Sequence, residues 1–147
     1  MLTVNQAALY PLLAMVTLTL VVWIWMYITR VTAVIKGELK MDAFQSAQKS
    51  HFPNRVIFAS DNLSNLFEMP VLFYSLTILL YITDMFSETQ LLLAWYYVGF
   101  RSLHSLIHCS YNKVVHRLLS YLVSSLILWL MWGIFAYELL INSMMMV

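Results

Sequence analysis

The chain has 147 residues, of which 62% are hydrophobic and only 10% are charged, with three glycines and three prolines. This balance lies far from that of a soluble protein and predicts a single integral membrane domain over residues 1–147. The net charge of +1 excludes the strongly basic surface of a nucleic-acid-binding protein, and a single cysteine excludes an internal disulfide.

Four apolar stretches are long enough to cross a bilayer, which takes roughly 20 residues per helix. They run over residues 7–35, 66–82, 91–107 and 118–141. Polar residues at their ends lengthen the second and third, so we expect helices over about 5–35, 56–83, 89–111 and 115–141. The first stretch has no cleavage pattern of a signal peptide and is interpreted as a retained helix. The predicted fold class is all-α, an integral membrane four-helix bundle.

All eight basic residues lie on one side of the predicted bundle, and the opposite side carries only acidic residues among its charges. The opposite side carries Asp84, Glu88 and Glu138, whereas the basic residues all fall in or beside the first and third connections. By the positive-inside rule, those connections are cytoplasmic and both termini lie outside the cytoplasm. Attraction to anionic lipid headgroups is a second expected effect of the basic residues. They are Arg30, Lys36, Lys40, Lys49, Arg55, Arg101, Lys113 and Arg117.

The predicted second helix carries a polar stripe at its cytoplasmic end. Asp61, Asn65 and Glu68 are spaced four and three residues apart, so they fall on one narrow helical face. Charge beside hydrocarbon is costly, and such a stripe is expected to face the bundle interior or a cleft between subunits. Pro70 follows two residues after Glu68, where it is expected to kink the helix and free the carbonyl of Leu66.

Two further polar stripes lie at the same membrane surface. On the predicted third helix, polar side chains spaced four, three, four and three residues apart again share one face. They are Tyr97, Arg101, His104, His108 and Tyr111. The predicted fourth helix begins with Arg117 and Tyr121, one turn apart. The stripes together predict one polar site, in which Arg101 and Arg117 can pair with Glu68 or with an anionic ligand.

Structural explanations of the same residues stay open at this point. In one alternative, Glu68 and Arg101 form an ion pair that only holds two helices together. His104 and His108 have the spacing of a helical metal-binding pair, but no second pair of ligands follows on another segment, so no metal site is predicted. Cys109 faces away from the stripe and is interpreted as a packing residue.

Two motifs make the chain resemble the MAPEG family, the membrane-associated proteins in eicosanoid and glutathione metabolism. The stretch NLFEMPVLF is similar to the family's second-helix signature, with Asn65, Glu68 and Pro70 at the matching positions. The stretch RSLHSLIH is similar to the third-helix signature, with Arg101 and His104 at the matching positions. Each motif alone has low specificity, but they occur in order and at the expected ends of the predicted helices.

The predicted fourth helix extends this resemblance. Arg117 lies sixteen residues after Arg101, and Tyr121 follows one turn later, which is similar to the arginine and tyrosine of the family's catalytic branches. The resemblance covers most of the chain. It implies a homotrimer of four-helix protomers, of a bacterial type and located in an inner membrane, with binding clefts between subunits that open toward the cytoplasm.

The resemblance also implies a ligand and roles for the site residues. In the enzymatic members, glutathione lies in the intersubunit cleft and the fourth-helix arginine stabilises its thiolate for attack on a lipophilic electrophile. Arg117 and Tyr121 are accordingly the catalytic candidates, and Arg117 would hold or activate the thiol. A cation beside a thiol favours the thiolate, and a site beside the acyl chains collects apolar substrates by partition. The ligand-binding candidates are Asp61, Asn65, Glu68, Arg101, His104 and His108.

Two departures from the family pattern bear on glutathione. Asp61 stands where many catalytic members have an arginine that holds a glutathione carboxylate, and His108 stands where a tyrosine is common. Reversing the charge at residue 61 disfavours an anion by about 1 to 2 kcal/mol in a partly screened cleft. Asp61 instead favours a ligand with an amine, or is neutralised by Arg55 or Arg117.

Three functions are compatible with these residues. The first is a glutathione-dependent transferase or peroxidase that acts on lipophilic electrophiles or lipid hydroperoxides. The second is a non-catalytic protein that binds or presents lipids, as one member of the family does. The third is a small transporter or proton-conducting bundle, which is disfavoured because nothing ionisable continues the polar stripes through the outer half of the membrane. Whether the chain is an enzyme therefore stays open. The expected partners are copies of itself, membrane lipids and a lipophilic small molecule.

Overall fold

Helices form where the apolar stretches predict them. The computed structural model describes residues 4–7, 9–45 and 51–145, so Lys49 of the predicted topology signal lies outside the described residues. The elements are α1 (Val4–Ala7), α2 (Leu9–Ile35), the short 3-10 helix η1 (Met41–Gln45), α3 (Asn54–Leu66), α4 (Met69–Ile82), α5 (Glu88–Cys109) and α6 (Val114–Met145). The described residues form no strand, and the predicted all-α class is confirmed.

The helix predicted over residues 56–83 consists of two helices in the structure. α3 ends at Leu66 and α4 begins at Met69, and Glu68 between them has a non-helical backbone with φ −99° and ψ −100°. Pro70 has no N–H to donate to the carbonyl of Leu66, so the α-helical ladder cannot continue across this point. The break therefore falls where the proline predicts a kink.

Three helical segments of the described residues are long and apolar enough to cross a membrane. They are Leu9–Ile35, Asn54–Ile82 and Val114–Met145. The fourth predicted crossing, α5, has 22 residues and is about 33 Å long, which suffices for a bilayer. The polar stripe of α5 lowers its mean hydropathy. For this reason α5, although long enough to cross a membrane, is less apolar than the other three segments.

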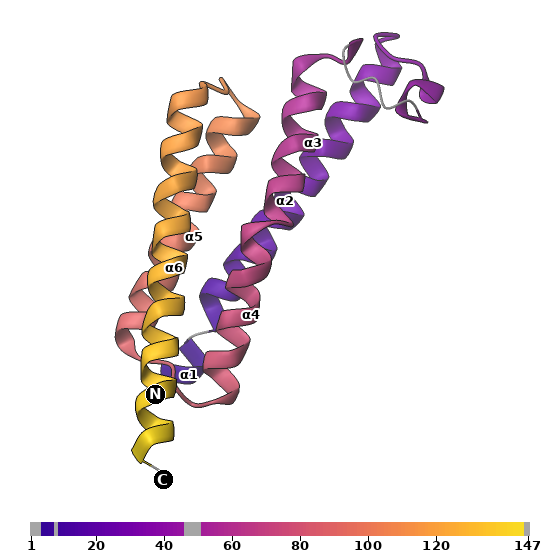
Figure 1. Ribbon diagram of the computed structural model, residues 1–147. Coiled ribbons are helices and arrows are strands. Elements are labelled where there is room, and N and C mark those ends of the chain that lie inside the picture. Colours follow the sequence, from indigo (N-terminus) through magenta and orange to yellow (C-terminus); the bar gives the residue numbers. More distant parts are fainter. Residues whose placement is uncertain (1–3, 8, 46–50, 146–147) are drawn as a thin grey trace.

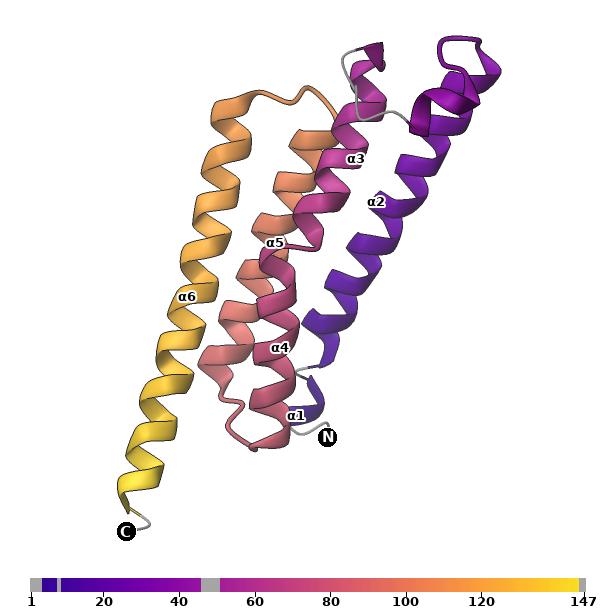
Figure 2. The ribbon, with the colours of Figure 1, turned by 45° about the vertical axis from the view of Figure 1, so that its right-hand side comes forward.

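The helices are arranged as two antiparallel pairs. α2 and α3 run side by side, and so do α5 and α6 (Figures 1 and 2). Both chain ends lie at the same end of the bundle, opposite η1 and the α5–α6 connection, so the chain traverses the bundle an even number of times. Toward the η1 end the two pairs diverge (Figure 1).

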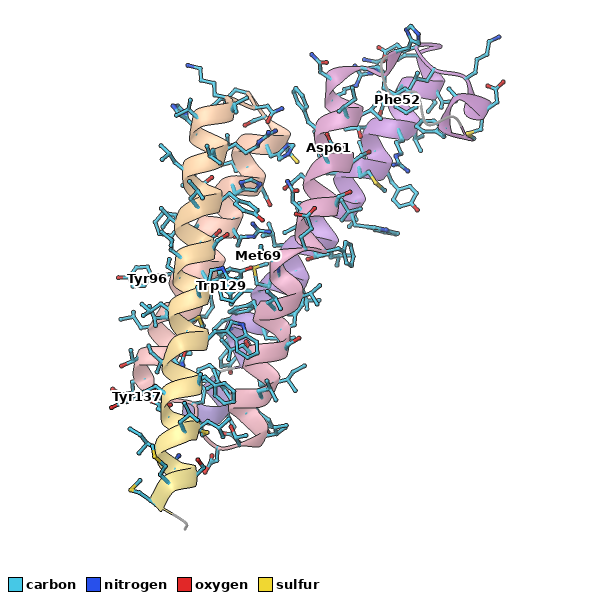
Figure 3. The ribbon with its side chains drawn as sticks, in the orientation of Figure 1. Phe52, Asp61, Met69, Tyr96, Trp129 and Tyr137 are labelled. Carbon is cyan, nitrogen blue, oxygen red and sulfur yellow. The ribbon has the colours of Figure 1, made fainter. Side chains whose placement is uncertain are left out.

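The buried residues change character along the bundle. The half nearer the chain ends contains an apolar core, in which the rings of Phe73 and Tyr97 stack with centroids 4.5 Å apart. Beyond Tyr97, the buried face of α5 continues as Arg101, His104 and His108. In lipid, packing and interhelical hydrogen bonds hold helices together more than the hydrophobic effect does. Outside the bundle, residues such as Tyr96 and Tyr137 point away from it (Figure 3).

Candidate functional site

The break between α3 and α4 leaves a backbone carbonyl to be satisfied from another helix. The guanidinium of Arg101 on α5 donates from Nη2 to the carbonyl oxygen of Asn65 at 2.6 Å. In a continuous helix that carbonyl would accept from the amide of Met69. Pro70 and Arg101 thus act on the same feature, because the proline interrupts the ladder and the arginine binds a carbonyl at the interruption.

Arg101 is fully buried, with none of its side-chain surface exposed. Its guanidinium carbon lies 5.1 Å from the centroid of the Tyr121 ring on α6, a cation–π contact. Its Nε and Nη1 atoms have no hydrogen-bond partner among the described residues. Glu68 is exposed and forms no ion pair with Arg101 in the part of the chain that the structure describes. A buried cation with two unused donors indicates a site that accepts further polar groups.

The two histidines of α5 connect that helix to the start of α6. His104 Nδ1 lies 3.0 Å from the carbonyl oxygen of Arg117, and His108 Nε2 lies 3.4 Å from Arg117 Nη1. The ring of Tyr121 lies 5.6 Å from that of His104. Both histidines are 2% exposed. Among the described residues, no group of three or more His, Cys, Asp or Glu side chains is placed to bind a metal.

Arg117 is held by the connection that precedes it. Asn112 Oδ1 accepts a hydrogen bond from Arg117 Nη1 at 3.0 Å. Asn112 has a φ of 48°, in the left-handed region that asparagine tolerates better than most residues. Its backbone amide donates to the carbonyl of Ile107 and so closes α5. The same residue therefore ends one helix and orients the first cation of the next.

A cavity of about 220 Å³ lies between these elements. It is lined by Asn65, Glu68, His104, Val114, Arg117, Leu118 and Tyr121. The structure thus brings candidates from all three predicted stripes to one hollow. Arg101 and His108 lie behind its wall, where they contact Tyr121 and Arg117 respectively. Asp61 is half-buried on α3, two turns before the break (Figure 3), and is not among the residues that line this cavity.

The sequence offers Arg55 and Arg117 as ion-pair partners of Asp61, and in the structure Arg55 pairs with another acid. Arg55 forms an ion pair with Glu38, in the connection between α2 and η1. Glu38 and Arg55 therefore link the end of α2 to the start of α3.

Sequence reasoning did not find Asn62, which is fully buried between α3 and α5. Its Nδ2 donates to Cys109 Sγ at 3.3 Å, and its Oδ1 accepts from Ser105 Oγ at 3.2 Å. The available signal was its position, because Asn62 falls in register with the apolar residues Ala59 and Leu66 on the buried face of α3. Cys109 packs half-buried against α3, where it accepts this bond.

The sequence model of the MAPEG family matches residues 8–137, which include α2 to α5 and most of α6. No curated protein and no solved structure matches the chain significantly.

Proposed function

Because the chain belongs to the MAPEG family and is an integral membrane protein, we propose that it is a glutathione-dependent transferase or peroxidase. Its substrates are lipophilic electrophiles or lipid hydroperoxides that reach the site from the bilayer. The observation that carries this proposal is the cavity in which Arg117 and Tyr121 of α6 meet Asn65 and Glu68 at the α3–α4 break. A cation there favours the thiolate form of a bound thiol.

The proposed transferase reaction forms one carbon–sulfur bond. The thiolate of glutathione attacks the electrophilic carbon of an aryl halide, and the halide leaves with the electrons of the carbon–halogen bond. The proton of the thiol passes to water. Arg117 stabilises the negative sulfur before attack, and Tyr121 lines the same cavity. Asn65 and Glu68 hold the peptide part of glutathione.

The cavity of one protomer is too small for the whole ligand. Pockets for drug-sized ligands have volumes of about 300–1,000 Å³, whereas this cavity has about 220 Å³. This small volume supports a site completed by a neighbouring copy, and we include a homotrimer in the proposal. Native mass spectrometry in detergent is expected to give three copies per complex.

We place the site at the cytoplasmic face of the membrane, with both termini on the other side. The cavity lies at the end of the bundle that holds η1 and the α5–α6 connection, where the basic residues gather. Glutathione is abundant in the cytoplasm, so this orientation gives the site its thiol. For a bacterial chain the membrane is the inner one.

Asp61→Arg tests the charge that opposes glutathione. Replacing the carboxylate with a guanidinium should tighten glutathione binding about threefold, because it turns a repulsion of the anionic ligand into an attraction from a half-buried position two turns from the cavity. Binding is measured by thermal shift in detergent against glutathione concentration. Asp42→Arg, the same change on the exposed face of η1, is the control and should leave the affinity unchanged. Equal affinities in all three proteins would remove residue 61 from the glutathione site.

Asn112→Gly tests how Arg117 is held. Glycine keeps the left-handed backbone but removes the acceptor for Arg117 Nη1, so the conjugation rate should fall about threefold to tenfold. Asp84→Gly is the matched control, because Asp84 also has a positive φ, of 56°, but lies in the α4–α5 connection at the other end of the bundle. A full conjugation rate in Asn112→Gly would show that Arg117 is oriented without Asn112.

A second candidate function is the binding or presentation of lipids without catalysis. Two apolar grooves favour it, one of about 330 Å³ between α2 and α5 and one of about 520 Å³ between α2 and α4. This function predicts that oleic acid raises the melting temperature of the purified protein and that glutathione does not. Stabilisation by millimolar glutathione, without stabilisation by oleic acid, would exclude it.

A further inference from the structure

The groove of about 520 Å³ between α2 and α4 shares no residue with the cavity that holds Arg117. Its lining comes from α2, from α4 and from the break between α3 and α4. The lining residues are Leu12, Val16, Thr19, Leu20, Trp23, Phe67, Tyr74 and Ile78. The hydroxyls of Thr19 and Tyr74 lie 3.4 Å apart and bond to each other. The rest of the lining is apolar and carries no charge, so the groove suits a hydrocarbon chain.

One face of α2 leads from this groove to Arg30. Trp23, Tyr27 and Arg30 are spaced four and three residues apart, so they share that face. The rings of Trp23 and Tyr27 are in contact, with centroids 4.7 Å apart. On α3, which runs antiparallel to α2, Ser60 bonds to Arg30. Phe67 follows Ser60 by seven residues and lines the groove, as Trp23 does seven residues before Arg30. Arg30 and Ser60 are therefore in line with the groove, beyond its end nearer η1.

Arg30 has only neutral partners among the described residues. Its Nη2 donates to Ser60 Oγ at 3.2 Å, and its guanidinium carbon lies 5.5 Å from the centroid of the Phe44 ring. Its Nε is buried and has no hydrogen-bond partner in the part of the chain that the structure describes. The nearby acid Glu38 pairs with Arg55 instead. A half-buried cation without a counter-ion is stabilised by an anion that reaches it.

The order of charge and apolar surface along α2 matches a lipid of the leaflet at the η1 end, which is the cytoplasmic leaflet in the proposed orientation. Arg30 lies toward η1, and the groove extends from it toward the opposite end of the bundle. Along the helix axis, Trp23 lies about 10 Å and Val16 about 21 Å from Arg30. Half of a bilayer with its headgroups is about 20 to 22 Å thick. A phosphate at Arg30 therefore leaves an acyl chain beside Trp23 and Val16 within the hydrocarbon of the same leaflet.

We propose that this groove binds one acyl chain of an anionic phospholipid whose phosphate contacts Arg30. The hydroxyl of Ser60 accepts from Arg30 and has its own proton to donate to a phosphate oxygen. Charge complementarity selects the anionic lipid, because a zwitterionic one brings no net charge to Arg30 and to the exposed Lys36 beyond it. The volume of the groove lies within the range of ligand pockets. The site is separate from the proposed glutathione cavity, and the proposal does not depend on turnover of glutathione.

The test measures lipid binding by native mass spectrometry of the full chain in detergent, without glutathione. Dioleoyl phosphatidylglycerol and dioleoyl phosphatidylcholine have the same acyl chains and differ in net charge. Wild type should bind the anionic lipid about fivefold more tightly, and Arg30→Gln should abolish this preference. Lys113→Gln is the matched control, because it removes the same charge from an exposed residue at the same end of the bundle, in the α5–α6 connection. It should keep the preference. An unchanged preference in Arg30→Gln would overturn the proposal.

Leu20→Trp tests the acyl-chain part of the site. Leu20 is 52% exposed in the groove, so the larger ring fills the groove without changing charge and should weaken binding of both lipids about threefold or more. Leu126→Trp makes the same exchange at an exposed position of α6 outside the groove and should bind both lipids as wild type does. Equal binding by Leu20→Trp and wild type would show that no acyl chain lies in the groove.

Two further outcomes would identify another occupant. Inorganic phosphate at millimolar concentration should not displace the lipid, because it lacks the acyl chain. Displacement would show that Arg30 binds a bare phosphate and would overturn the proposal. A change in the number of subunits per complex in Leu20→Trp would overturn it as well, because a second copy would then occupy the groove.

Discussion

Arg117→Ala is expected to lower the rate at which the purified protein conjugates glutathione to an aryl halide by about tenfold or more. The guanidinium is the cation of α6 that lines the cavity, and it is oriented by Asn112 and His108. Alanine removes the charge that stabilises the thiolate and leaves the carbonyl of residue 117, which His104 contacts, in place. The rate is followed by absorbance of the conjugate with glutathione in excess.

Two control variants distinguish loss of the positive charge at residue 117 from a general effect of the substitution on the protein. Arg117→Lys keeps the positive charge but loses the planar fork of donors, so it should retain part of the rate. Arg55→Ala removes an equal charge from the same end of the bundle, at a residue that pairs with Glu38, and should retain the full rate. Equal rates for Arg117→Ala and wild type would remove Arg117 from the proposed mechanism.

Asn62→Asp is expected to cause a large loss of stability at the α3–α5 contact. The two side chains have nearly the same shape, but aspartate brings a charge to a fully buried position and loses the amide that donates to Cys109. A loss of about 3 kcal/mol or more follows from the cost of a buried charge without a matched partner. For a chain of this size that corresponds to a fall in melting temperature of roughly 10 °C.

The matched control for that variant is an exposed asparagine of the same helix. Asn54→Asp makes the same exchange at the exposed first position of α3, so its melting temperature should stay near that of wild type. Differential scanning fluorimetry of both proteins in the same detergent gives the comparison. If Asn62→Asp melts at the temperature of wild type, the bonds from Asn62 to Ser105 and Cys109 do not hold α3 against α5.

The sequence predicted features that depend on one helix at a time. Composition and the lengths of the apolar stretches gave the helical membrane class, and the family motifs gave the MAPEG assignment that the family match confirms. Pro70 gave the break in the second helix, because the missing N–H is a local property of the chain. The spacing of the polar stripes gave the faces on which the site candidates lie.

The tertiary structure decided which atoms meet across helices. Periodicity assigns a residue to a face of its helix. Which residue of a neighbouring helix it contacts depends on how the two helices are shifted and tilted relative to each other. Asn65 binds Arg101 through its backbone carbonyl rather than its side-chain amide, and Glu68, three residues later, is exposed and has no ion pair with Arg101 among the described residues. Spacing along the helices predicts neither result.

Contacts between elements also explain why two residues of the site region were not predicted from the sequence. Asn62 and Asn112 are ordinary in the sequence, yet one satisfies two groups of α5 and the other holds Arg117. The partners of Asn62 lie on another helix, α5. The partner of Asn112 lies five residues later in the sequence, after a turn in which Asn112 itself has a left-handed backbone. The sequence by itself therefore determined the membrane helices, the helix break and the family, whereas only the packing of α3 and α6 against α5 determined which candidates share a cavity. Contacts between helices depend on the relative placement of all of them, and no single segment encodes that placement.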